Sequence, residues 1–334
     1  MPPAAARKYT TAQATRQPVT PQVVSHLKAK VGTVFRGGSM QEYVIRDYQK
    51  GYERGQARIG IEVARKWIWP YAYDQDDLLR IHAQPDFDPD TRHYCFLGEE
   101  MVGYMFSVIS TSGEQGVSTA VLEFPRMVPG HEQAAQLLMA RAFGALKAKG
   151  VSRVVGRVTT MCPGDIRLAE NTGFAIRDWG YKVYYSYEME CGRLDIPSEA
   201  AEEVDLGVDL DACAAIASLW YKRPAEWCVG RIRELYATGI IAHLGVRESG
   251  KLVAACLAAP NVLRPSTAAI HYIYAPDERS LLPMLAVAVN QCVEGGTHDL
   301  IADLVNEHRG YEPVYQRLGF VKVAEWARCE KTLT

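Results

Sequence analysis

The stretch YEPVYQRLGF, residues 311–320, predicts a short helix that stops at Gly319 and leads into a strand. The stretch IRLAENTGF, residues 166–174, has the same form and places Gly173 146 positions before Gly319. Pairs of this kind, far apart in one chain, indicate an internal repeat of a whole folding unit.

The segments before each stretch follow one order, which supports the repeat. Pro129 and Pro276 lie 147 positions apart, and each stands between a β-rich segment and a long helical segment. In the first copy we expect strands at 42–48, 93–97, 101–109, 117–128 and 151–161 and helices at 50–67 and 131–150. In the second copy we expect helices at 210–221, 224–237 and 278–296 and strands at 240–249, 250–259, 266–275 and 299–305.

Length and composition agree with two domains in a soluble chain. The 334 residues are 48% hydrophobic and 23% charged, with a formal net charge of −2. No apolar run approaches the ~20 residues of a membrane span, and no secretory leader is visible at the first residue, so we expect a cytoplasmic protein without a membrane partner. Residues 1–39, rich in Ala, Thr, Gln and Pro, predict a flexible N-terminal arm.

Nucleic-acid and metal-binding classes are not indicated. Lysine and arginine form no block, so we expect no nucleic-acid partner. The eight cysteines stand singly, without a C-x-x-C pair, which argues against a zinc site and a disulfide framework. We therefore expect no metal cofactor.

The order of elements and the closing motif at 314–320 (VYQRLGF) resemble the GNAT (N-acetyltransferase) superfamily. The resemblance implies an α/β (α+β) fold of two tandem GNAT-like modules, each a mixed, mostly antiparallel twisted sheet flanked by helices. Residues 40–193 would form the N-terminal module and residues 197–334 the C-terminal one. It also implies an acyltransferase that moves an acyl group from a pantetheine thioester to an amine or hydroxyl of a small molecule.

The loops that would hold the donor's diphosphate depart from the family pattern. That pattern is glycine-rich because backbone N–H groups at a helix N-terminus face the phosphates. Here the loops read PGHEQAAQLL from Pro129 and PDERSLLPML from Pro276, and each is about three residues shorter than the family's. We therefore expect the donor to be either acyl-CoA, with its affinity supplied by contacts elsewhere, or a phosphopantetheine thioester on a carrier protein, which presents one phosphate and is found in natural-product biosynthesis.

Four residues are candidates for catalysis. Tyr315 matches the family position for the acid that protonates the leaving thiolate, while Ala169 stands at the corresponding place in the first copy. Glu123 and His271, on the strands before the two loops, are candidate bases, and His308 is a weaker one. The alternatives are that Tyr315 packs its ring in the core and that Glu123 is a salt-bridged strand residue.

The resemblance also assigns donor contacts. The strand before each loop splays from its neighbour and pairs with pantetheine through its backbone. This assigns the donor site to Met127, Val128, Gly130, His131, Glu132, Gln133, Ile273 and Tyr274. The run WIWPYAY, residues 67–73, would shape an acceptor pocket or pack against the module.

Two other functions stay open from the sequence. One is a GNAT-like loading decarboxylase or acyl loader. The other is a catalytically inactive binding protein, because both loops depart from the family pattern.

Overall fold

A computed structural model of the protein describes residues 33–36, 39–68, 70–110, 118–197 and 199–333. The part of the chain up to residue 191 contains β1 (Thr33–Arg36), β2 (Ser39–Asp47), α1 (Glu53–Ala64), α2 (Gln75–His82), β3 (Arg92–Leu97), β4 (Glu100–Ser110), β5 (Thr119–Met127), α3 (Ala135–Ala148), β6 (Arg153–Thr159), α4 (Pro163–Asn171) and β7 (Ala175–Glu188). The rest contains β8 (Glu202–Glu203), α5 (Leu206–Tyr221), α6 (Ala225–Thr238), β9 (Ala242–Glu248), β10 (Lys251–Asn261), β11 (Arg264–Tyr274), α7 (Glu278–Glu294), β12 (Asp299–Val305), α8 (Glu312–Arg317) and β13 (Val321–Thr332). Short 3₁₀ turns precede α3 and α8, at Glu132–Ala134 and Asn306–Tyr311.

All strands in the described part of the chain join one sheet in the order β1-β2-β3-β4-β5-β6-β13-β7-β12-β11-β10-β9-β8. Most neighbours are antiparallel; β5 with β6 and β11 with β12 are parallel. The expected mixed, mostly antiparallel sheet with flanking helices is confirmed, as is its organisation as two tandem modules of one fold.

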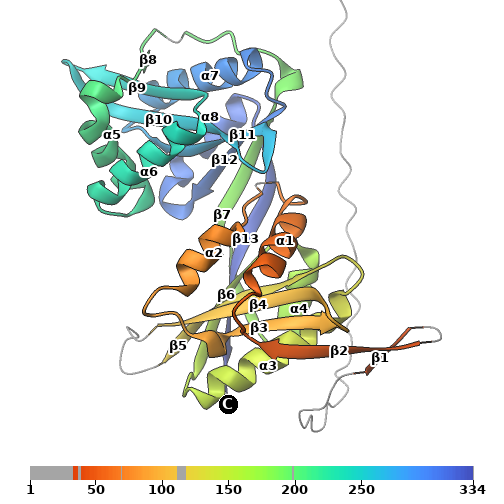
Figure 1. Cartoon of the computed structure of the whole chain (residues 1–334). Helices are drawn as coiled ribbons and strands as arrows, with labels where there is room; N and C mark the ends of the chain where they lie inside the picture. The colour runs from red at the N-terminus through yellow and green to blue at the C-terminus, as the bar shows by residue number, and fades with distance from the viewer. Residues whose placement is uncertain (1–32, 37–38, 69, 111–117, 198, 334) are drawn as a thin grey trace, which may run out of the picture.

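The last strand of each half passes into the other half. Residues 175–177 of β7 pair with 328–330 of β13 in the N-terminal half, whereas residues 182–188 of β7 pair with β12 in the C-terminal half. β13 pairs with β7 over residues 321–326 and then continues beside β6. Figure 1 shows β7 and β13 running from one half to the other, with the C-terminus at the end of the N-terminal half. Residues 326–332 thus complete the sheet of the N-terminal half.

Each half has its own apolar core. In the N-terminal half, α3 packs on one face of the sheet through Leu138, Met139 and Leu146, and α1 packs on the opposite face, where Ile59 is buried. In the C-terminal half, α7 and α8 share one core cluster and α5 and α6 share another, on the two faces of β9–β12. Alternation of side chains along each strand explains why both faces carry apolar residues.

A small cluster joins the halves. Ile68, from the segment WIWPYAY, packs with Trp326 against a buried cluster that includes Tyr184 and Ile301. The same segment is tied to the C-terminal half, because Asn261 Nδ2 donates a hydrogen bond to the Pro70 carbonyl at 2.8 Å. This run therefore contributes to the contact between the halves, in addition to its place beside the site described below.

The sequence missed some element boundaries for identifiable reasons. α2 was not expected, because its eight residues give only two turns; Asp74 caps it through the Asp77 N–H. The long helix of the first copy begins at Ala135 rather than at residue 131, after a 3₁₀ turn. The predicted arm, residues 1–39, falls mostly outside the described residues, but Thr33–Arg36 of that segment pairs with β2 as a β-strand.

Candidate functional site

The N-terminal half contains two parallel strands that separate. β5 and β6 pair only at residues 119–121 and 153–155, after which they diverge. The Val128 N–H donates to the Val102 carbonyl of β4 at 2.8 Å, so by alternation the peptide groups of Met127 point away from β4, toward the gap. A polar chain entering this gap would find backbone groups to pair with.

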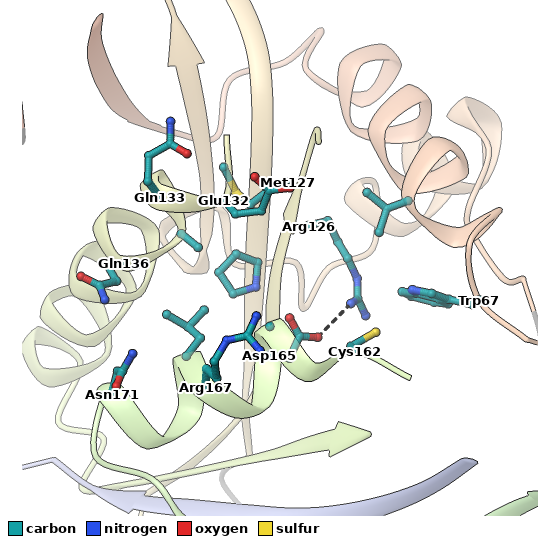
Figure 2. Close-up of a pocket in the computed structure, with 15 residues that line it drawn as sticks. Trp67, Arg126, Met127, Glu132, Gln133, Gln136, Cys162, Asp165, Arg167 and Asn171 are labelled. Carbon is teal, nitrogen blue, oxygen red and sulfur yellow. Dashed lines mark ion pairs between the residues drawn. The ribbon is translucent and has the colours of Figure 1, made fainter. Parts of the chain in front are cut away.

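A pocket of about 390 Å³ opens beside this gap, between α3 and α4. Figure 2 shows Gln136 from α3 and Arg167 and Asn171 from α4 facing it, with Met127 at the strand. The sequence predicted Met127, Glu132 and Gln133 as donor contacts, and all three line this pocket. Gly130 and His131 lie in the adjoining loop, and Val128 packs against the cluster under α1.

Four side chains stand where the pocket meets the strand gap. The Arg126 guanidinium lies 4.3 Å from the Trp67 ring centroid, and its Nη1 is 3.7 Å from Asp165 Oδ2. Cys162 hydrogen-bonds to Trp67. These four residues also line a second, smaller cavity of about 20 Å³ on the other side, and Figure 2 shows them grouped at one end of the first pocket. They form the boundary between the two spaces.

Burial raises the pKa values of two of these four residues, Asp165 and Cys162. Burial raises the pKa of Asp165 to about 6, with Arg126 lowering it in part and Glu123 raising it further. Asp165 is the third residue of α4, directly after Pro163 and Gly164. Burial likewise raises the pKa of the Cys162 thiol to about 11, so this thiol is protonated at neutral pH. Asp165 is thus a carboxyl group that exchanges its proton close to neutral pH.

Glu123, the predicted base, lies in the smaller cavity. Its Oε1 accepts a hydrogen bond from Arg157 Nη2 at 3.0 Å, and its Oε2 is 3.6 Å from Arg126. The structure thus brings Glu123 to the same centre as Arg126 and Asp165, and it also shows the ion pairs that the alternative interpretation expected. The two arginines fix the position of the Glu123 carboxylate. A fixed position suits a general base as well as an ion-pair residue, so these contacts agree with both interpretations.

The loop between β5 and α3 is closed by the chain's own carboxylate. Gly130 has φ +93°, and its N–H donates to both oxygens of Glu132, at 2.9 and 3.1 Å. The Tyr43 hydroxyl lies 3.0 Å from His131 Nδ1 and accepts a hydrogen bond from Gln133 Nε2 at 2.6 Å. A diphosphate at this N-terminus would have to displace Glu132 and meet its negative charge. The residues of this loop therefore do not fit a diphosphate cradle.

The corresponding gap in the C-terminal half is occupied. β11 and β12 pair at residues 267–269 and 299–301 and then separate in the same way. The Tyr311 hydroxyl accepts a hydrogen bond from the Ala275 N–H at 3.0 Å and donates one to the Ala275 carbonyl at 2.9 Å. Asp277 caps α7 through the Ser280 N–H. The Tyr311 side chain thus already occupies the N–H and carbonyl groups of Ala275, with which a chain entering this gap would otherwise pair.

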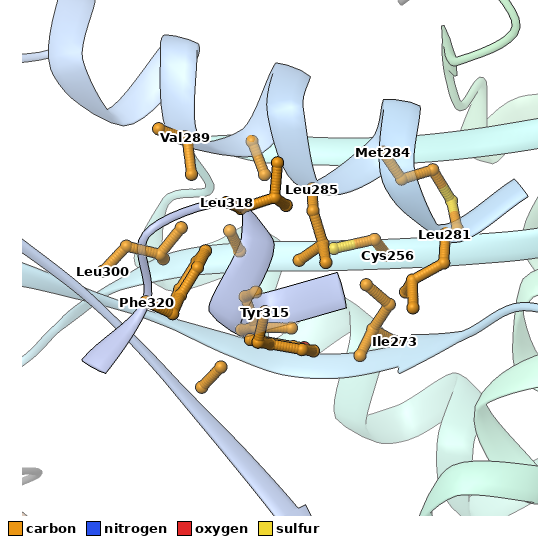
Figure 3. Close-up of a cluster of buried hydrophobic side chains, with 14 of the residues drawn as sticks. Cys256, Ile273, Leu281, Met284, Leu285, Val289, Leu300, Tyr315, Leu318 and Phe320 are labelled. Atoms are coloured by element: carbon orange, nitrogen blue, oxygen red, sulfur yellow. The ribbon is translucent and has the colours of Figure 1, made fainter. Parts of the chain in front are cut away.

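Tyr315 lies in the core of the C-terminal half. It has no exposed surface, and Figure 3 shows its ring under α7, beside Cys256, Leu285 and Phe320. Its hydroxyl is a buried group without a hydrogen-bond partner in the described part of the chain, and burial raises its pKa well above the usual value. The structure favours the packing interpretation of Tyr315. Ile273, predicted as a donor contact, is fully buried in the same core, and the neighbouring Tyr274 packs on the opposite face.

The two histidines of the C-terminal half are apart from the centre described above. His271 lines a cavity of about 170 Å³ with Lys182 and Asp303, and burial lowers its pKa to about 4. His308 stacks between Trp220 and Tyr311, with ring centroids at 4.3 and 5.7 Å. His271 is thus a neutral imidazole near a half-buried ion pair, and His308 is part of an aromatic stack. Of the four predicted catalytic residues, only Glu123 lies beside the N-terminal pocket.

Sequence reasoning missed Arg126, Asp165 and Cys162. Arg126 follows Pro125 inside the strand that carries Glu123, and Asp165 follows a Pro-Gly pair that opens α4. A polar residue at the start of a helix that directly follows a buried strand was the available signal.

Within the described ranges no three His, Cys, Asp or Glu side chains gather closely enough to hold a metal ion. In the same part of the chain, no helix combines the length and apolar character that a membrane crossing requires.

Comparison with known proteins identifies the fold. No family model and no curated protein sequence matches the chain. Among solved structures, a tandem GNAT protein from the clavulanic acid biosynthesis pathway matches with a TM-score of 0.58 and 12% identity, over 88% of this chain and 99% of that one. A GCN5-related N-acetyltransferase from Sphaerobacter thermophilus matches with a TM-score of 0.57 and 14% identity, over 87% and 96%. A GNAT-family acetyltransferase from Colwellia psychrerythraea gives 0.58 and 14%, over 86% and 99%.

Proposed function

Because the chain has the tandem GNAT fold, whose structural neighbours include acetyltransferases, we propose that it is an acyltransferase that works at the N-terminal strand gap. The observation that carries this proposal is the difference between the halves. The N-terminal gap opens onto a pocket of about 390 Å³, whereas the backbone groups at the C-terminal gap are bonded to Tyr311. The donor in this proposal is a pantetheine thioester, and the acceptor is an amine or hydroxyl of a small molecule.

The donor's arm lies between β5 and β6 and pairs with the peptide groups of Met127. A carrier-protein phosphopantetheine suits the loop better than CoA, because Glu132 already occupies the Gly130 N–H and a single phosphate brings less negative charge. One structural neighbour comes from a natural-product pathway, which is the support for placing this chain in specialised metabolism.

In the proposed mechanism, three charged groups act at the centre, namely Glu123, Arg126 and Asp165. The acceptor's amine or hydroxyl attacks the thioester carbonyl carbon, and Glu123 takes its proton. Arg126 lies within 4 Å of both Glu123 and Asp165, where its guanidinium can stabilise the oxyanion of the tetrahedral intermediate. As the C–S bond breaks, Asp165 in its protonated form gives its proton to the thiolate. The acceptor leaves acylated and the donor leaves as the free thiol.

In this mechanism Asp165 serves as the general acid, a role that the family pattern gives to a tyrosine. The position of that tyrosine is held by Ala169 in the N-terminal half. Ala169 has no proton to give and is fully buried. A carboxyl group with a pKa of about 6 is about one-tenth protonated at pH 7, which is a useful fraction for a general acid.

A second candidate is a binding protein without catalysis. The specific observation in its favour is the small volume, about 20 Å³, of the cavity that Glu123, Arg126 and Asp165 line. In that case the pocket between α3 and α4 would bind a pantetheine-like molecule without turnover.

Titration calorimetry and thiol release separate these functions. The replacement Gln136→Trp should fill the pocket and weaken binding of acetyl-CoA or an acyl-pantetheine, whereas Arg279→Trp, at the exposed start of α7, should leave binding unchanged. Donor-dependent thiol release in the presence of an acceptor supports transfer, and carbon dioxide release from a malonyl thioester identifies a decarboxylase. Binding without either release supports the second candidate, and weakened binding by Arg279→Trp alone contradicts the proposed site.

A further inference from the structure

A row of three arginines crosses the sheet of the N-terminal half. Arg157 of β6 stands opposite Arg328 of β13, and Arg328 stands opposite Arg177 of β7. Like charges directly opposite each other on neighbouring strands destabilise a sheet. Packing does not require them, because their side chains are 56, 64 and 67% exposed.

The row lies on the face of the sheet opposite α3. Val154, Val158 and Cys329 belong to the core under α3, so by alternation their neighbours Arg157 and Arg328 point to the other side. There they line an open groove of about 670 Å³. Three of its twelve lining residues, Arg328, Cys329 and Glu330, come from β13, the strand that passes over from the C-terminal half.

The groove has a positive balance. Its lining includes four arginines and two acids, namely Arg153, Arg157, Arg177, Arg328, Asp178 and Glu330. Glu330 is shared by Arg153 at 2.5 Å and Arg177 at 3.5 Å, and Asp178 is 3.8 Å from Arg328. Arg157 pairs with Glu123, outside the groove lining. These arginines are therefore held in place, and an anion would find guanidinium groups with further donors.

The groove adjoins the proposed transfer centre through one shared side chain. Arg157 lines both the groove and the small cavity that contains Glu123 and Asp165. Across the sheet, Arg177 lies two strands from Arg157, which is about 10 Å at the usual strand spacing.

We infer that the groove binds the acceptor through an anionic group, a carboxylate or a phosphate, which the acceptor carries within about 10 Å of its reacting amine or hydroxyl. The identification of the bound molecule as the acceptor rests on the proposed function. The anion site itself does not depend on catalysis. The row of arginines orients the molecule while Glu123 meets the reacting end.

The test uses the full chain and two simple anions. Citrate supplies carboxylates and inorganic pyrophosphate supplies phosphates, and calorimetry measures their binding to the wild type, to Arg328→Gln and to Arg193→Gln. Arg193 is a matched control, because it is 62% exposed and pairs with Glu294 outside the groove. We expect at least one anion to bind, and we expect Arg328→Gln to weaken it about tenfold and Arg193→Gln to leave it unchanged. The anion that binds more tightly identifies the group.

Three results would overturn the inference: binding of neither anion, equal weakening by both variants, or no weakening by either. The acetyl-CoA or acyl-pantetheine titration on the same proteins keeps the two proposals apart. If that donor fails to bind while citrate or pyrophosphate binds in an Arg328-dependent way, the proposed function fails and the anion site stands. If the donor binds and neither anion does, the anion site fails alone.

Discussion

Replacing Asp165 by Asn should stabilise the protein more at neutral pH than in acid. Burial raises the pKa of Asp165 from 3.8 to about 6 in the folded protein, so folding favours the protonated form. The stability associated with this group is complete below pH 3.8 and is lost as the pH rises through 6. Asn imitates the protonated form at every pH.

The magnitude follows from the two pKa values. A difference of about two units corresponds to about 3 kcal/mol of unfolding free energy once both forms are ionised. We therefore expect Asp165→Asn to stabilise the protein by about 1 kcal/mol at pH 4.5 and by about 3 kcal/mol at pH 7.5. The attraction of Arg126 is already contained in this value, because it lowers the same pKa.

Urea unfolding of the wild type and the variant at both pH values measures the difference. Asp195→Asn, at an exposed position, serves as the control for the substitution itself. A difference between Asp165→Asn and the wild type that does not grow with pH would refute the argument. Asp165 would then be an ordinary ionised carboxylate, and its proposed role as acid would lose its basis.

Three further predictions concern the halves and the loop. Tyr315→Phe should leave transfer unchanged and leave stability equal or higher by about 1 kcal/mol, because it removes a buried hydroxyl without a partner; thiol release and urea unfolding measure this. Tyr311→Phe should destabilise the protein by about 1–3 kcal/mol in urea unfolding, because the peptide groups of Ala275 lose both bonds to its hydroxyl. Glu132→Gln should strengthen binding of CoA several-fold relative to pantetheine in calorimetry, because a negative charge leaves the Gly130 N–H.

Each of these has an outcome that contradicts it. Slow transfer by Tyr315→Phe would return catalysis to the C-terminal half. Unchanged stability of Tyr311→Phe would mean that solvent replaces its hydroxyl without cost. An equal effect of Glu132→Gln on CoA and on pantetheine would show that the carboxylate does not compete with phosphate.

The sequence predicted the repeat because glycine, proline and periodicity are local signals. The turns at Gly173 and Gly319 both have positive φ, +79° and +91°, as helix ends that lead into strands require. No local signal predicts that β7 and β13 pass into the opposite halves. The pairing of Arg328 with Arg157, for example, joins residues that are 171 positions apart in the sequence.

The site was predicted in part for the same reason. Glu123 and Met127 were found because they lie on a strand that a family pattern describes. Asp165 was missed because its raised pKa arises from burial and from the charge of Glu123, which lies on another element of the fold. Tyr315 matched the pattern by position, but the pattern contains no information on whether its hydroxyl reaches a cavity.

The rate of acceptor-dependent thiol release in Glu123→Gln and His271→Gln tests the central claim most directly. Catalysis in the N-terminal half predicts a loss of about 100-fold or more for Glu123→Gln and a rate within twofold of the wild type for His271→Gln. A large loss for His271→Gln, with Glu123→Gln near the wild-type rate, would contradict it and place the chemistry in the C-terminal half.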